Sequence, residues 1–143
     1  MIITEVRFKL CDVNAETGDR LRAFASVVFD GCYKVHDIRV IEGNGGLFVA
    51  MPSRKLTDRC RHCREKNHLL AKFCNECGSR LDDNRAKADA TGRLDLNTDT
   101  EHPIHTAFRQ EIERKILGDY EAELFASRRP GYLCRYGAGA VKA

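Results

Sequence analysis

The sequence lacks any run of apolar residues long enough to cross a membrane. A membrane-spanning helix needs about 18 to 20 consecutive apolar residues, and no stretch of the 143-residue chain approaches that length. We do not expect a secretory signal either. It would need a basic start and an uninterrupted apolar stretch, whereas the first residues, MIITEVRFKL, mix apolar and charged side chains. We therefore expect a cytoplasmic protein with no membrane partner.

Tryptophan is absent, aromatic residues make up 8% of the chain, and the formal net charge is only +3. These values predict a modest core, in one domain with at most a small additional module. The net charge by itself says little about partners, so an argument for nucleic acid must rest on where the charges lie. Because no serine, cysteine or carboxylate lies in a recognisable catalytic motif, we expect neither an enzyme nor a small-molecule substrate.

Cysteine, in contrast, is plentiful. Seven cysteines in a cytosolic chain are unsuited to a disulfide framework, because cytosolic thiols are kept reduced. Four of them form the pattern C-x2-C-x10-C-x2-C, namely Cys60, Cys63, Cys74 and Cys77. Two such pairs can bring four sulfurs within about 2.3 Å of one tetrahedral zinc ion. The spacing therefore predicts one structural Zn²⁺, whose closed coordination shell leaves no site for a catalytic water.

Other interpretations of this segment remain open. A CxxC pair is also typical of thiol redox proteins, and His62 or His68 could replace a cysteine as a ligand. We expect Phe73 and Leu81 to form a small apolar plug beside the metal. The segment resembles zinc-ribbon knuckles, which bind nucleic acid in some proteins and other proteins in others.

The first third of the chain predicts an antiparallel meander of four strands. Alternating or continuous apolar residues mark strands at 2–10, 20–29, 33–41 and 47–51, with a turn at 12–19 and a glycine-rich hairpin loop at 42–46. The apolar phase changes between Val35 and Ile38, which predicts a β-bulge near His36 and Asp37. The fourth strand has no polar residue, so we expect both of its faces to be covered.

A long amphipathic helix is predicted from Pro103 to about residue 126. Apolar residues recur at helical spacing, and Pro103 suits a first helical turn; the stripe is Ile104, Phe108, Ile112, Ile116, Tyr120 and Leu124. The fold class is therefore α+β, an antiparallel four-stranded sheet covered by a C-terminal helix, with a small zinc-ribbon insertion. Residues 94–96 could add one short strand, and residues 127–143 are expected to be a flexible tail.

Three segments together carry a family resemblance: ITEVRFKL at 3–10, VHDIRVIEGNGGLFVAMPSRK at 35–55, and HPI at 102–104 followed by a helix containing Arg109. They resemble the stage V sporulation protein G (SpoVG) family. The resemblance implies a homodimer joined through strands, and a bacterial regulator that binds DNA and RNA rather than an enzyme. It also implies a discontinuous family domain at 1–55 and 98–126, interrupted by an inserted zinc module at 57–88. The family name refers to sporulation and septation, and no residue pattern assigns either process to this chain.

Positive charge is concentrated in and before the cysteine segment. Residues 54–72 hold seven cations and two anions, and the cations are Arg54, Lys55, Arg59, Arg61, Arg64, Lys66 and Lys72. Clustered cations bind phosphates by releasing condensed counterions, so we expect these residues and Arg109 to contact nucleic acid. The alternatives are a solvated basic surface with no binding role, an adaptor whose zinc ribbon binds a partner protein, or thiol redox chemistry in a protein without zinc.

Overall fold

The computed structural model describes residues 1–12 and 19–137 and divides the chain into two compact units. One unit combines Met1–Pro52 with Glu101–Ala143, and the other is Ser53–Thr100. Most of the turn predicted at 12–19, and residues 138–143 of the predicted tail, lie outside the described residues. Within those ranges no helix is both long and apolar enough to span a membrane.

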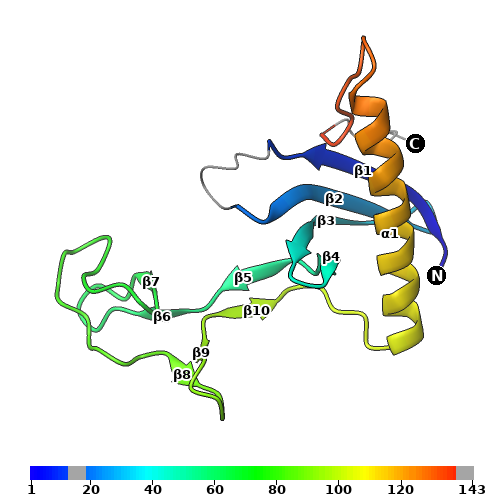
Figure 1. The fold of residues 1–143 in the computed structure, drawn as a ribbon. Coiled ribbons are helices and arrows are strands. Elements are labelled where there is room, and N and C mark those ends of the chain that lie inside the picture. Colours follow the sequence, from blue (N-terminus) through cyan, green and yellow to red (C-terminus); the bar gives the residue numbers. More distant parts are fainter. Residues whose placement is uncertain (13–18, 138–143) are drawn as a thin grey trace. The chain divides into compact units, whose positions relative to one another are not determined.

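Four antiparallel strands form the sheet of the first unit, in the order β1-β2-β3-β4 (Figure 1). They are β1 (Ile3–Leu10), β2 (Leu21–Phe29), β3 (Tyr33–Gly43) and β4 (Gly46–Ala50). Gly43 pairs with Gly46 across a two-residue turn, Asn44-Gly45, which is a favoured sequence for a tight hairpin. The predicted meander and hairpin are confirmed.

The predicted β-bulge is also confirmed. Ala25 pairs with Ile38 and Val27 pairs with Val35, so one residue of β2 lies opposite two residues of β3, His36 and Asp37. Asp37 has φ of 61°, a left-handed conformation that shifts the side-chain alternation by one residue. This shift lets Val35 and Ile38 both enter the core, where they are 8% and 1% exposed.

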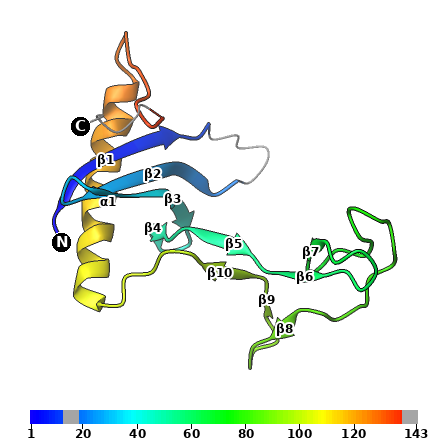
Figure 2. The same ribbon diagram turned by 180° about the vertical axis from the view of Figure 1, so that it is seen from behind.

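Helix α1 (Thr106–Ser127) covers one face of this sheet, in front of it in Figure 1 and behind it in Figure 2. The predicted stripe packs on the sheet through buried Ile112, Ile116 and Tyr120 and partly buried Phe108 and Leu124. The Tyr120 ring lies 6.1 Å from that of Phe8. The helix thereby supplies the apolar cover that the strand pattern requires.

The start of the helix differs from the prediction. His105 is the N-cap and has extended backbone angles, so the helix begins at Thr106 and Pro103 precedes the first turn instead of lying in it. Ile104 is outside the helix and 94% exposed, so it does not belong to the buried stripe. Apolar periodicity alone placed the boundary too early, because the HPI segment happens to continue the helical spacing.

Strand β4 is less covered than predicted. Val49 is buried, but Phe48 is 43% exposed, because neighbouring side chains of a strand face opposite sides and α1 packs on only one of them. β4 is also an edge strand of this sheet.

The described part of the predicted tail contacts the rest of its unit. The Tyr136 hydroxyl accepts a hydrogen bond from the Asp37 amide at 3.1 Å and donates one to the Asp37 carboxylate at 3.0 Å. Tyr132 donates to Glu123 at 2.6 Å. The tail thus gives the Asp37 backbone amide, which lies in the bulge, a hydrogen-bond partner.

The second unit contains three two-stranded ladders. β5 (Ser53–Lys55) pairs with β10 (Asn97–Asp99), β6 (Thr57–Arg59) with β7 (Lys66–His68), and β8 (Lys87–Ala88) with β9 (Leu94–Asp95). Leu94 thus lies in a strand, whereas Leu96 falls between β9 and β10. The unit extends beyond residues 57–88 because the β5–β10 ladder belongs to it. Its buried apolar cluster is only Cys60, Cys74 and Leu81 with partly buried Ala71, too little to stabilise a fold without a further constraint.

Candidate metal centre and basic strand pair

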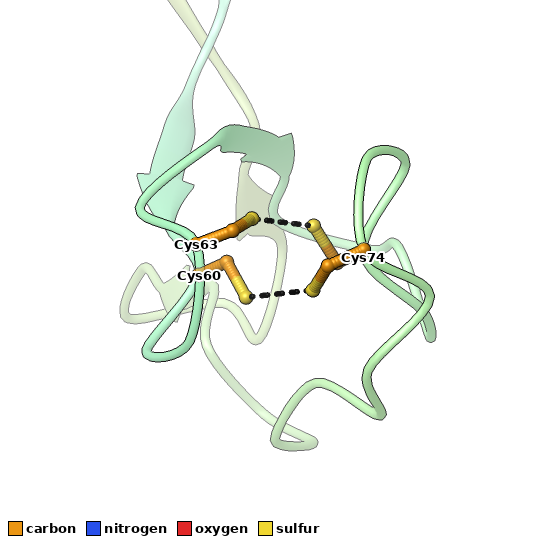
Figure 3. A group of neighbouring side chains, drawn as sticks. Cys60, Cys63 and Cys74 are labelled. Carbon is orange, nitrogen blue, oxygen red and sulfur yellow. Dashed lines mark hydrogen bonds between the residues drawn. The ribbon is translucent and has the colours of Figure 1, made fainter.

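The first cysteine pair lies on a tight turn directly after β6. The Arg64 amide donates to the Cys60 carbonyl at 3.0 Å, and the Cys60 amide donates to the Glu65 carbonyl at 2.8 Å. Arg64 closes the turn with φ of 64°, a conformation that non-glycine residues adopt at a cost. The turn points Cys60 and Cys63 toward the same side (Figure 3).

The second cysteine pair repeats the same turn. The Gly78 amide donates to the Cys74 carbonyl at 3.0 Å, and the Cys74 amide donates to the Ser79 carbonyl at 2.8 Å. Gly78 has φ of 73° and occupies the place that Arg64 has in the first turn. A glycine adopts this conformation without strain. The two turns therefore share one geometry, but only the first turn carries the free-energy cost of a strained backbone.

The two turns bring four sulfurs together. Cys63 Sγ and Cys74 Sγ are 3.5 Å apart, and Cys60 Sγ and Cys77 Sγ are 3.7 Å apart (Figure 3). All four sulfurs lie within 4.8 Å of one another. Disulfides would need about 2.05 Å, whereas a tetrahedron with arms of about 2.3 Å has edges of about 3.8 Å. The four predicted ligands therefore form a group that could hold one metal ion.

Asn67 supports this group from β7 and was not identified from the sequence. Its side chain is 3% exposed, and its amide nitrogen donates to Cys74 Sγ at 3.4 Å and to the Glu65 carbonyl at 3.1 Å. Its amide oxygen accepts from the Asn75 backbone at 2.8 Å. One buried amide thus links both turns, an arrangement that orients ligands in metal sites.

Hydrogen bonds give three of the thiols different pKa values. The Cys77 backbone amide, followed by the Asn67 side chain, lowers the pKa of Cys74 to about 6. The Ser79 hydroxyl lowers the pKa of Cys77. At Cys63 the Glu65 amide favours the thiolate, but burial and the bonds to the other thiols outweigh it and raise the pKa to about 12. A bound metal ion would displace the remaining protons.

Arg85 fastens the segment after the second turn and was also missed by the sequence argument. Its guanidinium donates to the Asp58 carboxylate and to the carbonyls of His68, Ala71 and Asp82, the last three at 3.0, 2.7 and 2.9 Å. Its side chain is only 11% exposed. Arg85 therefore ties β6, β7 and the loop after the second turn into one piece.

The β6–β7 ladder separates two kinds of side chain. Asp58 and Asn67 are opposite each other, and they face Arg85 and the cysteine group. Residues alternate between faces along a strand, so Arg59 and Lys66 share the other face, where both are exposed and directly opposite each other. Two cations in such a pair repel each other and destabilise the ladder.

The remaining predicted cations are dispersed. Arg54 and Lys55 are neighbours on β5 and therefore point to opposite faces of that ladder, while Arg109 lies in the first turn of α1 in the other unit. Arg61 forms an exposed ion pair with Asp82 at 2.8 Å. The exposed cations Arg64 and Lys72 lie in the turns and loop around the cysteines. Arg59 and Lys66 are the two predicted cations that the structure pairs across a ladder.

Two expectations about neighbouring side chains change. Leu81 is 8% exposed beside Cys60 and Cys74, as predicted for the plug, but Phe73 is 59% exposed and does not belong to it. The metal-ligand group found among the described residues contains cysteines alone, without His62 or His68. His68 Nδ1 instead accepts a hydrogen bond from the Leu70 amide at 3.0 Å.

Comparison with known proteins identifies the family. The sequence model of the SpoVG family matches residues 1–122. A Clostridium kluyveri protein named "Putative septation protein SpoVG" is 36% identical over 121 residues, covering 85% of this chain and 84% of the relative. Proteins of the same name from Priestia megaterium and Treponema denticola are 52% and 48% identical over 58 residues, covering 41% of this chain and 56% and 58% of the relatives. The chain therefore belongs to the SpoVG family.

Proposed function

We propose that this protein is a nucleic-acid-binding regulator in which one structural Zn²⁺ holds a cationic strand pair in shape. The observation that carries the proposal is the direct opposition of Arg59 and Lys66 on the exposed face of β6–β7. In a fold selected only for stability, one of these positions would favour an anion. A phosphate between the two side chains would relieve their repulsion and release counterions from the nucleic acid.

The β8–β9 ladder of the same unit offers a contrast. There Lys87 is opposite Asp95, a pair of opposite charges that stabilises a ladder without any ligand. The difference between the two ladders supports a binding role for β6–β7.

Zinc is the metal best suited to the cysteine group. Four thiolates at near-tetrahedral separations are a typical donor set of structural zinc, and they fill its coordination shell. Cys60 immediately follows Arg59 at the end of β6, so a metal bound there would fix the strand that carries the cation. Metal binding and folding of this unit are then coupled.

Membership in the SpoVG family supports the same class of function. The resemblance implies binding of DNA and RNA and control of gene expression, and the relatives are named for septation. It also implies a homodimer joined through strands, which we propose for this chain. The edge position of β4 and the exposure of Phe48 support that interface.

The test is fluorescence anisotropy of labelled random-sequence DNA and RNA, titrated with the zinc-loaded protein at several salt concentrations. The Arg59→Ala/Lys66→Ala variant should bind more weakly, and its plot of log affinity against log salt should be shallower by about 2 if two duplex phosphate contacts are lost. The Lys87→Ala/Arg93→Ala variant removes the same charge from the β8–β9 hairpin and is the matched control. If both variants lose the same affinity for nucleic acid, the effect comes from net charge alone and not from the β6–β7 pair.

Zinc and dimer are tested separately. Elemental analysis should give one zinc per chain, and chelation should unfold the second unit and weaken nucleic-acid binding. Sedimentation should show a dimer that Phe48→Glu disrupts without removing zinc. Unchanged binding after complete zinc removal would contradict the structural role of the metal.

A protein-interaction adaptor is the second candidate. It is favoured by two exposed apolar side chains of the second unit, Leu70 at 53% and Phe73 at 59%. The absence of any nucleic-acid binding at low salt would select it over the regulator.

A further inference from the structure

An aromatic ring stands exposed beside the cysteine group. Phe73 directly precedes the buried Cys74, yet 59% of its surface is accessible. Its backbone is held by a bridge to Arg80, and the Leu81 amide donates to the carbonyl of the preceding Lys72 at 2.8 Å. The ring is thus displayed from a rigid position next to a metal ligand.

A guanidinium group supports one side of this ring. The central guanidinium carbon of Arg80 lies 5.3 Å from the centre of the Phe73 ring, within the range of cation–π attraction. Arg80 is itself fastened by an ion pair with Asp83 at 3.2 Å and a hydrogen bond to the Lys72 carbonyl at 3.5 Å. Ring and guanidinium are therefore arranged before any ligand arrives, so little side-chain entropy is lost on binding.

We propose that the Phe73–Arg80 pair is a stacking site for an unpaired nucleobase. The inference rests on the proposed nucleic-acid-binding function and deepens it, because it assigns a preference for single-stranded RNA or DNA. Bases stack on exposed aromatic rings and on arginine planes largely without regard to sequence. In a duplex the base faces are occupied by neighbouring pairs, so this site adds affinity only for single strands.

The first unit contains a matched pair in a different electrostatic setting. The Arg129 guanidinium carbon lies 5.1 Å from the Phe125 ring, which is 62% exposed. That pair follows Glu121 and Glu123 at the end of α1, whereas Phe73 follows the cation-rich segment 54–72. The Phe125–Arg129 pair is therefore the control: it is also an exposed aromatic ring beside an arginine, but no cation-rich segment precedes it to attract phosphates.

The experiment uses the absence of tryptophan from this sequence. Phe73→Trp and Phe125→Trp each place a single tryptophan, whose indole can be excited apart from the tyrosines, in the full, zinc-loaded chain. Each variant is titrated with a single-stranded oligonucleotide of about 12 nucleotides and with a duplex of equal length. Anisotropy of the labelled nucleic acid measures binding in the same samples, and zinc content checks that the variant folds.

The expected result is that the single strand quenches the indole emission of the Phe73→Trp variant. The duplex should leave that emission unchanged, and neither nucleic acid should quench the Phe125→Trp variant. Phe73→Ala should weaken single-strand binding by about 5- to 150-fold and leave duplex binding almost unchanged.

Two outcomes would contradict the inference, and they are distinguishable. Binding by anisotropy with unchanged emission from the Phe73→Trp variant would overturn the stacking site while leaving the proposed function intact, and the ring would then belong to a protein contact. No anisotropy change with any nucleic acid at low salt would overturn both.

Discussion

Replacing Asn67 with alanine tests whether a buried amide holds the metal centre together. The change removes the donor to Cys74 Sγ and leaves the Asn75 backbone amide without its acceptor. A hydrogen bond to a charged group contributes about 1.5–3 kcal/mol, and each 1.4 kcal/mol changes affinity about tenfold. Zinc affinity should therefore fall by about 10- to 100-fold, which is also the range found for outer partners of metal ligands.

Competition with a chromophoric zinc chelator measures this loss directly. Asn67→Asp should lose more than Asn67→Ala, because a carboxylate oxygen would face the Cys74 thiolate in place of an N–H donor. Asn75→Ala is the matched control, since Asn75 contributes only its backbone amide and its residue is exposed. A zinc affinity of Asn67→Ala within about twofold of the parent would refute the assigned role of the amide.

Three other outcomes can be checked with purified zinc-loaded protein. Gly78→Ala should destabilise the second unit by about 1–2 kcal/mol in thermal melts. The cause is the backbone alone, because φ is +73° and no atom lies within 4 Å of the added Cβ. Arg64→Gly should stabilise the unit, and a loss of stability in that variant would refute backbone strain. Arg85→Leu leaves the Asp58 carboxylate without its guanidinium partner and should lower the stability of the second unit by about 1.5–3 kcal/mol. The loss should appear as faster amide hydrogen exchange in residues 57–85. Arg85→Lys should not restore protection from exchange, because a lysine cannot bond all four groups that Arg85 contacts. Because the pKa of Cys74 is lowered to about 6, protons compete with zinc for this thiol mainly below that pH, so zinc affinity should fall more steeply with pH below about 6 than above it. An unchanged slope across that value would contradict this proton competition.

The features predicted correctly from the sequence are those with a local, periodic or spacing signal. The β-bulge followed from a change of apolar phase between Val35 and Ile38, and the structure places the extra residue there. The clustering of four cysteines that could hold a metal ion followed from the spacing of two CxxC pairs, which the two tight turns bring together. Each signal lies within a few residues of the feature that it specifies.

The features that were missed depend on contacts distant in sequence. Asn67 and Arg85 are single polar residues outside any repeating sequence pattern, and only the folded turns show that one contacts Cys74 Sγ and the other joins three segments. Phe73 was expected in the apolar plug because its side chain is apolar, but it forms a backbone bridge with Arg80 and is 59% exposed. The early helix start at Pro103 arose because apolar spacing cannot distinguish a first turn from the extended residues before it.

The β5–β10 ladder has a consequence for how such a chain can acquire new parts. Ser53 and Asp99 are directly paired, so the two strands that lead into and out of the intervening segment begin about 5 Å apart. Any segment whose own ends meet at that spacing could be exchanged at this ladder without stretching the flanking chain, and lengthening it would add little closure entropy. For an engineer, the ladder is therefore a defined position at which to graft a different binding module.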